Sequence, residues 1–311
     1  MKSSTTRREW RVPVGRRIDG APWQVRFVEL RGATPGPATA IVSGLYGDKP
    51  LGSIAVHDLE RHLIQEQLKG TVLLAAAVNL PALQVGTRVS PDHLYLNRRF
   101  PGTPSGFLTD QVAHAVATVV YEHAECIIDL HSGTPEMALW YSYDAGDLEL
   151  TSSFGYLPVV VDFRPGGQVS ATAVERGLSG FLPEFGGASL PSPAAGVEGS
   201  LNTLRYRGHL GGSPTGPPRL PVIRERPLFL ASTSGILQSG VSTDAVGSEI
   251  PEGRLGWITS PATGEIWEEF EIDRPGILLM AVTTPKIVNP GDFAFMVGFP
   301  HDEVEVPGAS R

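Results

Sequence analysis

Four apolar segments in the first 130 residues have the pattern of β-strands. WQVRFVEL at 23–30 and ATAIVSG at 38–44 are short and rich in apolar residues, and CIIDLH at 126–131 has the same character. TVLLAAAVN at 71–79 is a continuous apolar run, which is typical of a strand buried on both faces of a sheet. These segments predict at least four strands in this part of the chain.

Two segments between these strands have the period of an amphipathic helix. In 52–68 the apolar positions recur at close to every 3.6 residues, at Ile54, Leu59, Leu63 and Ile64. In 107–124 the same period relates Leu108, Val112, Val116, Val119 and Val120, and Thr109 is a candidate cap at its start. The order of strands and helices predicts an α/β sheet with helices on both faces.

The pattern changes after residue 212. GGSPTGPPRLP at 211–221 is rich in glycine and proline and predicts a linker. GEIWEEFEI at 264–272 and GILLMAV at 276–282 are short runs separated by turn residues, as in antiparallel sheets. We therefore expect one α/β domain over 1–212 and a smaller, mostly β domain over 213–311.

Charge and length exclude several classes of protein. The net charge is −8, and the one basic cluster, at 7–17, is interpreted as a solvated terminal segment, so a nucleic-acid-binding surface is not expected. No apolar run approaches the 18 residues that a membrane-spanning helix needs. MKSSTTRREW lacks the apolar core of a signal peptide, and Cys126 has no second cysteine to pair with. These features favour a cytoplasmic protein with no membrane partner.

Four further segments hold the candidate chemistry, and their order is informative. They are SGLYGDKPLG at 43–52, GTRVSPDHLYLNRRFPG at 86–102, IIDLHSG at 127–133 and FLPEFGGAS at 181–189. Ligands of α/β folds bind beyond the carboxyl ends of the strands, where the first and third segments lie. Asp129 and His131 are two residues apart on a strand and share a face, so the carboxylate can orient the imidazole. From the pattern alone, a merely structural His131 remains an equal alternative.

These segments resemble the motifs of the succinylglutamate desuccinylase/aspartoacylase family. That family usually has G-x-H-G-[DN]-E, then D-L-N-R-x-F-P-G, then D-L-H-[ST]-G, then E-x-G, and the resemblance covers about residues 38–212. It implies a mixed-sheet zinc carboxypeptidase-like domain with helices on both faces, followed by a smaller C-terminal β domain. It also implies a hydrolase that acts on the amide or ester bond of a small, carboxylate-bearing N-acyl amino acid, and a homodimer is compatible with the family.

The resemblance assigns roles to five positions of this chain. His131 matches a zinc ligand, and Glu184 matches the glutamate that activates the zinc-bound water. Asn97 and Arg98 match the pair that holds the substrate carboxylate, a role that suits the planar fork of arginine. Arg88 matches a basic residue that often precedes the LNR motif.

Three positions depart from the family pattern. Tyr46 stands where the first zinc-binding histidine is expected, Lys49 where the zinc-binding glutamate is expected, and Tyr95 where an aspartate usually precedes LNR. A catalytic zinc normally has three protein ligands, and this chain keeps one of them. We therefore expect a site without zinc in the family's position, in which Lys49 pairs with Glu184 or another carboxylate. A retained zinc would need a substitute ligand such as His93.

Two functions follow from this mixture. In the first, the chain is a hydrolase or an acyl-transfer enzyme of altered chemistry, in which Lys49 and Tyr46 donate hydrogen bonds to the developing oxyanion. In the second, it is a non-catalytic protein that binds a carboxylate ligand. The joint retention of Glu184, His131 and the Asn97–Arg98 pair favours the enzyme.

Overall fold

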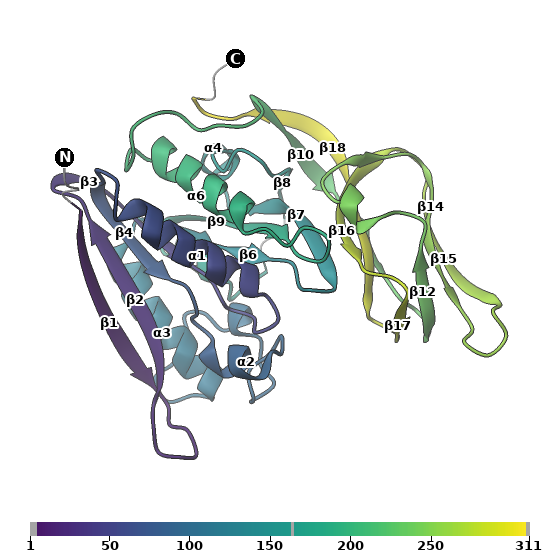
Figure 1. The fold of residues 1–311 in the computed structure, drawn as a ribbon, viewed down its shortest axis with the longest axis horizontal. Helices are drawn as coiled ribbons and strands as arrows, with labels where there is room; N and C mark the ends of the chain where they lie inside the picture. Colours follow the sequence, from purple (N-terminus) through teal and green to yellow (C-terminus); the bar gives the residue numbers. More distant parts are fainter. Residues whose placement is uncertain (1–4, 163–164, 309–311) are drawn as a thin grey trace.

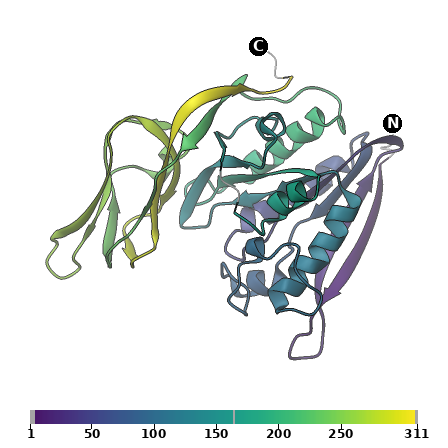
Figure 2. The same cartoon turned by 180° about the vertical axis from the view of Figure 1, so that it is seen from behind.

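The computed structural model describes residues 5–162 and 165–308. Residues 1–4 and 163–164 of the predicted domain 1–212, and residues 309–311 of the predicted domain 213–311, lie outside the described residues. Figures 1 and 2 show a layered α/β region that carries both kinds of element, and a region of strands alone that extends from one side of it. Within the described residues, no helix has the length and apolar character needed to cross a membrane.

The α/β region contains the predicted strands and helices. Its strands are β1 (Thr6–Val14), β2 (Trp23–Arg31), β3 (Thr34–Val42), β4 (Lys69–Ala75), β5 (Cys126–Asp129), β6 (His131–Ser132), β7 (Met137–Asp144), β8 (Val159–Val160) and β9 (Ser179–Gly186). Its helices are α1 (Pro50–Leu63), α2 (Leu80–Val85), the 3₁₀ turn η1 (Leu96–Arg98), α3 (Leu108–His123), α4 (Leu148–Ser152), α5 (Val169–Glu175) and α6 (Ala194–Tyr206).

A mixed sheet forms the centre of this region. Strands β4, β3, β5 and β9 are parallel neighbours, while β1 and β2 add to one side and β7 to the other in antiparallel orientation. Helices α3 and α5 pack on one face, and α1, α4 and α6 pack on the other. The predicted α/β fold with helices on both faces is therefore confirmed.

Alternation along the strands explains why both faces are covered. In β3, Ala40 and Val42 belong to the core with α3, whereas Ile41 belongs to the core with α1. In β4, Leu73 and Leu74 divide in the same way. A strand whose successive side chains are all apolar can bury both faces, which is the physical basis of the continuous run at 71–79.

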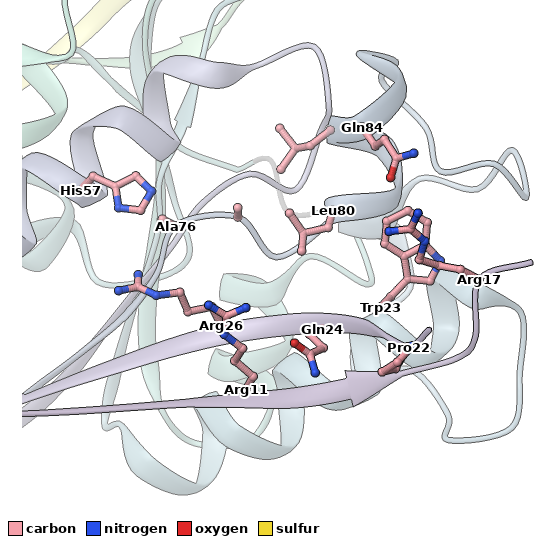
Figure 3. A pocket seen from close by; sticks show the side chains of 12 residues that line it. Arg11, Arg17, Pro22, Trp23, Gln24, Arg26, His57, Ala76, Leu80 and Gln84 are labelled. Carbon is pink, nitrogen blue, oxygen red and sulfur yellow. The ribbon is translucent and has the colours of Figure 1, made fainter. Parts of the chain in front are cut away.

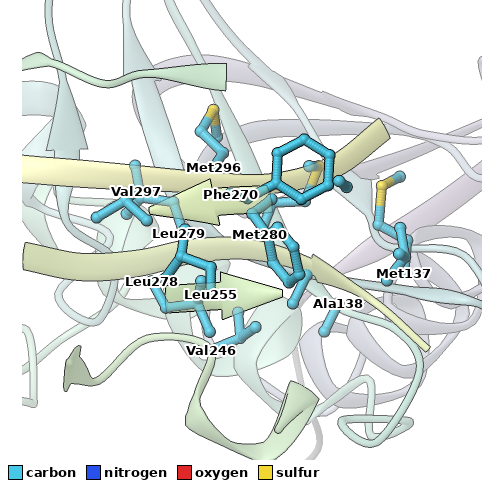
Figure 4. Packing of buried hydrophobic residues seen from close by; sticks show 14 of the residues in the cluster. Met137, Ala138, Val246, Leu255, Phe270, Leu278, Leu279, Met280, Met296 and Val297 are labelled. Carbon is cyan, nitrogen blue, oxygen red and sulfur yellow. The ribbon is translucent and has the colours of Figure 1, made fainter. Parts of the chain in front are cut away.

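Over the described residues 213–308, the regular elements are strands and the 3₁₀ turn η2. They are β10 (Arg219–Glu225), β11 (Leu228–Leu230), β12 (Gly235–Ser239), the 3₁₀ turn η2 (Thr243–Ala245), β13 (Glu249–Ile250), β14 (Gly253–Thr259), β15 (Ile266–Ile272), β16 (Gly276–Val282), β17 (Lys286–Val288) and β18 (Phe293–Glu305). Four of these strands form a second, smaller sheet in the order β15-β14-β12-β17. This sheet packs against the end of the large sheet, and apolar side chains fill the space between the two sheets (Figure 4).

Main-chain pairing joins this C-terminal region to the first one. Strand β10 pairs with β8 and β18, and β16 pairs with β7. The linker predicted over 211–221 is therefore wrong at its end, because Arg219–Pro221 already pair with β18, and Leu220 is buried. The domain boundary between residues 212 and 213 stays a prediction, since one sheet continues across it.

Most residues of Thr6–Val14 in the basic N-terminal segment are exposed, in agreement with its interpretation as a solvated segment, but this part of the chain is also an ordered strand. It forms β1, and all nine of its residues pair with β2. Arg7 contacts Glu9 and Glu60, and Arg26 of β2 contacts the same two carboxylates. Figure 3 shows how this hairpin, with Arg11 and Arg26, borders a groove whose other side carries His57 and Leu80.

A buried histidine after the end of α6 contacts strands β3 and β4. His209 follows α6 and is fully buried; its Nδ1 lies 2.9 Å from the carbonyl oxygen of Lys69, and its Nε2 lies 2.7 Å from the hydroxyl of Thr39. These partners assign a neutral ring that donates from Nδ1 and accepts at Nε2. Burial lowers the pKa of His209 to about 4, because the charged ring would lose its hydration.

His209 is expected to make the protein less stable in mild acid. Its folded pKa lies below the unfolded value of about 6.5, so the unfolded state binds more protons between the two values, and stability falls as the pH drops from about 6.5 to about 4. The full shift corresponds to roughly 3 kcal/mol. Urea unfolding across this pH range should show a flatter dependence for His209→Gln, whereas His301→Gln, at an exposed position, should keep the steep one. Parallel curves for all three proteins would contradict the account.

Candidate active site

The four motif segments meet at one cavity of about 210 Å³, at the carboxyl ends of the central strands. The seven residues singled out from the sequence all line it: Tyr46, Lys49, Arg88, Asn97, Arg98, His131 and Glu184. His93 is not among the lining residues; it is exposed and has a φ of +61° in the loop before η1. The seven predicted site residues therefore line one cavity, whereas His93, the predicted substitute zinc ligand, does not line it.

The turn between β3 and α1 supplies Tyr46 and Lys49. Gly47 lies between them and packs closely on α2, since an added Cβ would lie 2.1 Å from the carbonyl oxygen of Ala82. Pro50 begins the helix, where its missing N–H needs no partner. This turn is therefore held rigidly, and it directs both side chains into the cavity.

A buried ion pair occupies the centre of the site. The Lys49 Nζ atom lies 2.8 Å from each carboxylate oxygen of Glu184, and the two side chains are 4% and 10% exposed. Burial lowers the pKa of the Lys49 ammonium, and the Glu184 carboxylate opposes that shift. The predicted pairing of Lys49 with Glu184 is present in the structure.

His131 is oriented by a carboxylate behind it. Its Nε2 lies 2.7 Å from Asp129 Oδ1, and the Asn97 amide donates to Asp129 Oδ2 at 2.9 Å. The other ring nitrogen, Nδ1, faces the cavity and lies 4.0 Å from Glu184 Oε1. The Asn97 Oδ1 atom accepts from the Val169 N–H at 2.9 Å, so the amide of Asn97 is used within the protein. Its predicted contact with a substrate carboxylate stays a prediction.

Tyr46 covers the imidazole. The centroid of its ring lies 5.3 Å from the centroid of the His131 ring. The guanidinium of Arg88 lies over the Tyr46 ring, 4.6 Å from its centre, and makes a cation–π contact with it. Burial raises the pKa of Tyr46 to about 12, so its phenol is protonated at neutral pH. Tyr46 is therefore a hydrogen-bond donor and not an anionic ligand.

Arg98 brings a second guanidinium to the cavity. Its Nη1 donates to the carbonyl oxygen of Asn97 at 2.6 Å, which fixes the side chain beside its own turn. Gly167, with a φ of +74°, lies against this turn, since an added Cβ would lie 2.4 Å from the Arg98 carbonyl oxygen. The remaining N–H groups of Arg98 suit a carboxylate.

The sheet itself forms the floor of the cavity. In the strand register, Glu184 of β9 lies opposite His131 of β6 on one side and opposite Tyr141 of β7 on the other. Tyr141 and Tyr143 share a face of β7, and their rings meet edge to face at 4.9 Å. Sequence reasoning missed both tyrosines, although the apolar and aromatic run MALWYSYD at 137–144 could have indicated a strand.

The residues at the family's metal position do not fit a zinc ion. A tetrahedral zinc site needs nitrogen, sulfur or carboxylate ligands, and here two of the three positions hold a protonated phenol and a buried ammonium. The ammonium of Lys49 would also repel a dication. Over residues 5–162 and 165–308, the structure contains no cluster of three or more His, Cys, Asp or Glu side chains that could hold a metal.

Comparison with known proteins agrees with this scaffold. The sequence profile of the succinylglutamate desuccinylase/aspartoacylase catalytic domain matches residues 35–202. The N-alpha-acetyl-L-2,4-diaminobutyric acid deacetylase of Halomonas elongata is 29% identical over 281 residues, which cover 83% of this chain and 80% of the relative.

Solved structures give the same result. A succinylglutamate desuccinylase/aspartoacylase from Rhodobacter sphaeroides superposes with a TM-score of 0.82 at 25% identity and covers 97% of both chains. The product-bound ectoine utilization protein EutE (DoeB) from Ruegeria pomeroyi shares the fold, with a TM-score of 0.80 at 22% identity over 96% of this chain and 95% of that one. The chain belongs to the succinylglutamate desuccinylase/aspartoacylase family, whose members are hydrolases of N-acyl amino acids.

Restoring the two family ligands is expected to create a zinc site. The double substitution Tyr46→His with Lys49→Glu would place a histidine and a carboxylate beside His131, completing a three-ligand set. Zinc bound per chain, measured by elemental analysis after dialysis, should rise from a trace to near stoichiometric. Lys286→Glu, at a surface ion pair outside the cavity, is the matched control and should not change it. Equal zinc in the unmodified protein and the double variant would contradict this expectation.

Proposed function

We propose that this chain hydrolyses the amide bond of a carboxylate-bearing N-acyl amino acid without a metal ion. In this proposal, the ammonium of Lys49 takes the electrostatic role that zinc has in the family. One observation carries it, namely the buried contact of Lys49 Nζ with both oxygens of Glu184. The family membership and the deacetylase relative support the class of reaction.

The ion pair places a base and an oxyanion donor side by side. An ammonium has three N–H donors, and Glu184 accepts from two of them, which leaves one for a substrate carbonyl oxygen. In a buried site such a charged donor stabilises a developing oxyanion more strongly than it would in water. Tyr46, as a protonated phenol, is the second candidate donor at this site.

The reaction then follows from these groups. Glu184 accepts a proton from a water molecule whose oxygen attacks the acyl carbon, and the carbonyl oxygen becomes an anion beside Lys49. When the C–N bond breaks, Glu184 returns the proton to the leaving nitrogen. The products are a carboxylic acid and a free amino acid. If the acceptor is an amine or an alcohol in place of water, the same steps give acyl transfer.

The imidazole and the arginines position the substrate in this scheme. The Nδ1 atom of His131 faces the carboxylate of Glu184 and can accept a hydrogen bond from the amide N–H. Arg98 holds the substrate carboxylate, and Arg88 adds positive charge next to it.

Arg98→Lys is expected to weaken carboxylate binding about tenfold, because a point charge cannot replace a two-point hydrogen-bonded fork. Calorimetric titration with an N-acetyl amino acid measures the effect. Arg99→Lys is the matched control, since Arg99 pairs with Asp110 at 2.6 Å and does not line the cavity. Equal losses for the two variants would remove the special role of Arg98.

The alternative is a protein that binds such a ligand and does not convert it. The retained Asp129–His131 contact and the retained Glu184 favour catalysis, since binding a carboxylate alone requires neither of them. Release of free amine from a panel of N-acetyl-L-amino acids, followed with a fluorogenic amine reagent, distinguishes the two functions. Turnover supports the hydrolase, whereas saturable binding without turnover of any member would establish the binding protein.

A further inference from the structure

Four apolar side chains from four neighbouring strands line the cavity that contains the ion pair. In the strand register, Leu139 of β7 lies opposite Met280 of β16, Met280 lies opposite Met296 of β18, and Met296 lies opposite Leu228 of β11. All four side chains line the cavity that contains Lys49. We call this set the apolar row.

The apolar row extends from the floor of the cavity to its rim. Leu139, Met280 and Met296 are 2%, 4% and 2% exposed, whereas Leu228 is 41% exposed. Figure 4 shows Met280 and Met296 within the packed cluster that joins the two sheets. Methionine is unbranched and adapts its shape, so such a surface accommodates a flexible hydrocarbon chain.

The charges around the same cavity restrict what such a ligand can be. The described side chains that line the cavity include the ammonium of Lys49 and the guanidinium groups of Arg88, Arg98 and Arg226, but among Asp and Glu only Glu184. The Arg226 Nη1 lies 3.6 Å from Met296 Sδ, so one of these cations is directly beside the apolar row. A cationic substrate side chain is disfavoured there, and an anion with an uncharged hydrocarbon part is favoured.

We infer that the apolar row is a subsite for an unbranched aliphatic group of the substrate, whose carboxylate lies toward the arginines. This rests on the proposed function in taking the substrate to be an N-acyl amino acid. The aliphatic group can belong either to the acyl part or to the amino-acid side chain, and both present the same chemistry to the four residues. The inferred substrate therefore differs from an N-acyl derivative of diaminobutyric acid, because the side chain of diaminobutyric acid carries an amino group.

Two series of compounds separate the two sources. The first keeps the acetyl group and lengthens the side chain, from N-acetyl-L-alanine to N-acetyl-L-norleucine. The second keeps L-alanine and lengthens the acyl group from acetyl to pentanoyl. Within one series, kcat/KM should rise about fourfold for each methylene that enters the row. Dissociation constants from calorimetry on the same compounds provide a readout that does not need turnover.

A matched pair of variants tests the apolar row directly. Leu228 and Leu230 lie on the same short strand and are both 41% exposed. Of these two leucines, Leu228 lines the cavity and Leu230 does not. Leu228→Gln should reduce the rise in kcat/KM to about twofold or less for each methylene of the substrate. Leu230→Gln should leave this rise at the value of the unmodified protein.

The outcomes distinguish this inference from the proposed function. Affinity that rises along one series without turnover supports the subsite and refutes the hydrolase. Turnover with no rise along either series overturns the subsite and leaves the hydrolase in place. Faster turnover of Nα-acetyl-L-2,4-diaminobutyric acid than of N-acetyl-L-norvaline, or equal effects of the two leucine variants, would also overturn the subsite.

Discussion

Glu184→Gln is expected to lower kcat for amide hydrolysis by a factor of about 10² to 10⁴, the usual contribution of a general base. Glutamine has the same shape, and its amide oxygen still accepts a hydrogen bond from Lys49, but it cannot take a proton from water. Substrate affinity should therefore change much less than kcat. Single-turnover kinetics together with calorimetric binding separate the two effects.

The control for this variant is Glu136→Gln. Glu136 pairs with Lys286 at 2.7 Å, and its side chain is 67% exposed and does not line the cavity of about 210 Å³. Its substitution should leave kcat unchanged. A Glu184→Gln protein that keeps its full rate, with the unmodified protein active, would show that another group activates the water.

Lys49→Met is expected to destabilise the protein by about 3–5 kcal/mol, because it leaves the buried carboxylate of Glu184 without its partner. Adding Glu184→Gln to this variant should recover a large part of the loss, since no uncompensated charge then remains in the cavity. Urea unfolding with a constant slope across the variants measures both steps.

An ion pair at the surface, 2.7 Å long against 2.8 Å for Lys49–Glu184, provides the comparison. Lys286→Met breaks the 2.7 Å contact with Glu136 at the surface and should cost no more than about 1 kcal/mol. If the Lys49 variant lost as little, or if the double variant were less stable than Lys49→Met alone, the Lys49–Glu184 contact would not be a buried, charged pair.

The central sheet could be predicted because local sequence determines it. The apolar run at 71–79 covers β4 from Thr71 to its end, the helical period at 107–124 contains α3, and the period at 52–68 covers α1 from Gly52 to its end. The order of the four motifs placed the candidate residues at strand ends, and strand ends of a parallel sheet meet on one edge. For that reason the convergence of Lys49, His131 and Glu184 followed from the sequence.

The other half of the cavity could not be predicted in this way. Met280 and Arg226 reach it because β16 pairs with β7 and β10 pairs with β8, and such long-range pairings leave no local signal. Strand β1 was missed for a related reason, since its cluster of charged residues resembles a solvated segment until its pairing with the predicted strand β2 is known. Periodicity therefore located the catalytic candidates but not the surface opposite them.

The most direct test of the account is to measure metal content and turnover on the same preparation, before and after treatment with a strong chelator. The account predicts substoichiometric zinc throughout, the same kcat before and after chelation, and no gain when zinc is added back. One zinc per chain, with activity lost on chelation and recovered with added zinc, would contradict the claim that Lys49 replaces the metal.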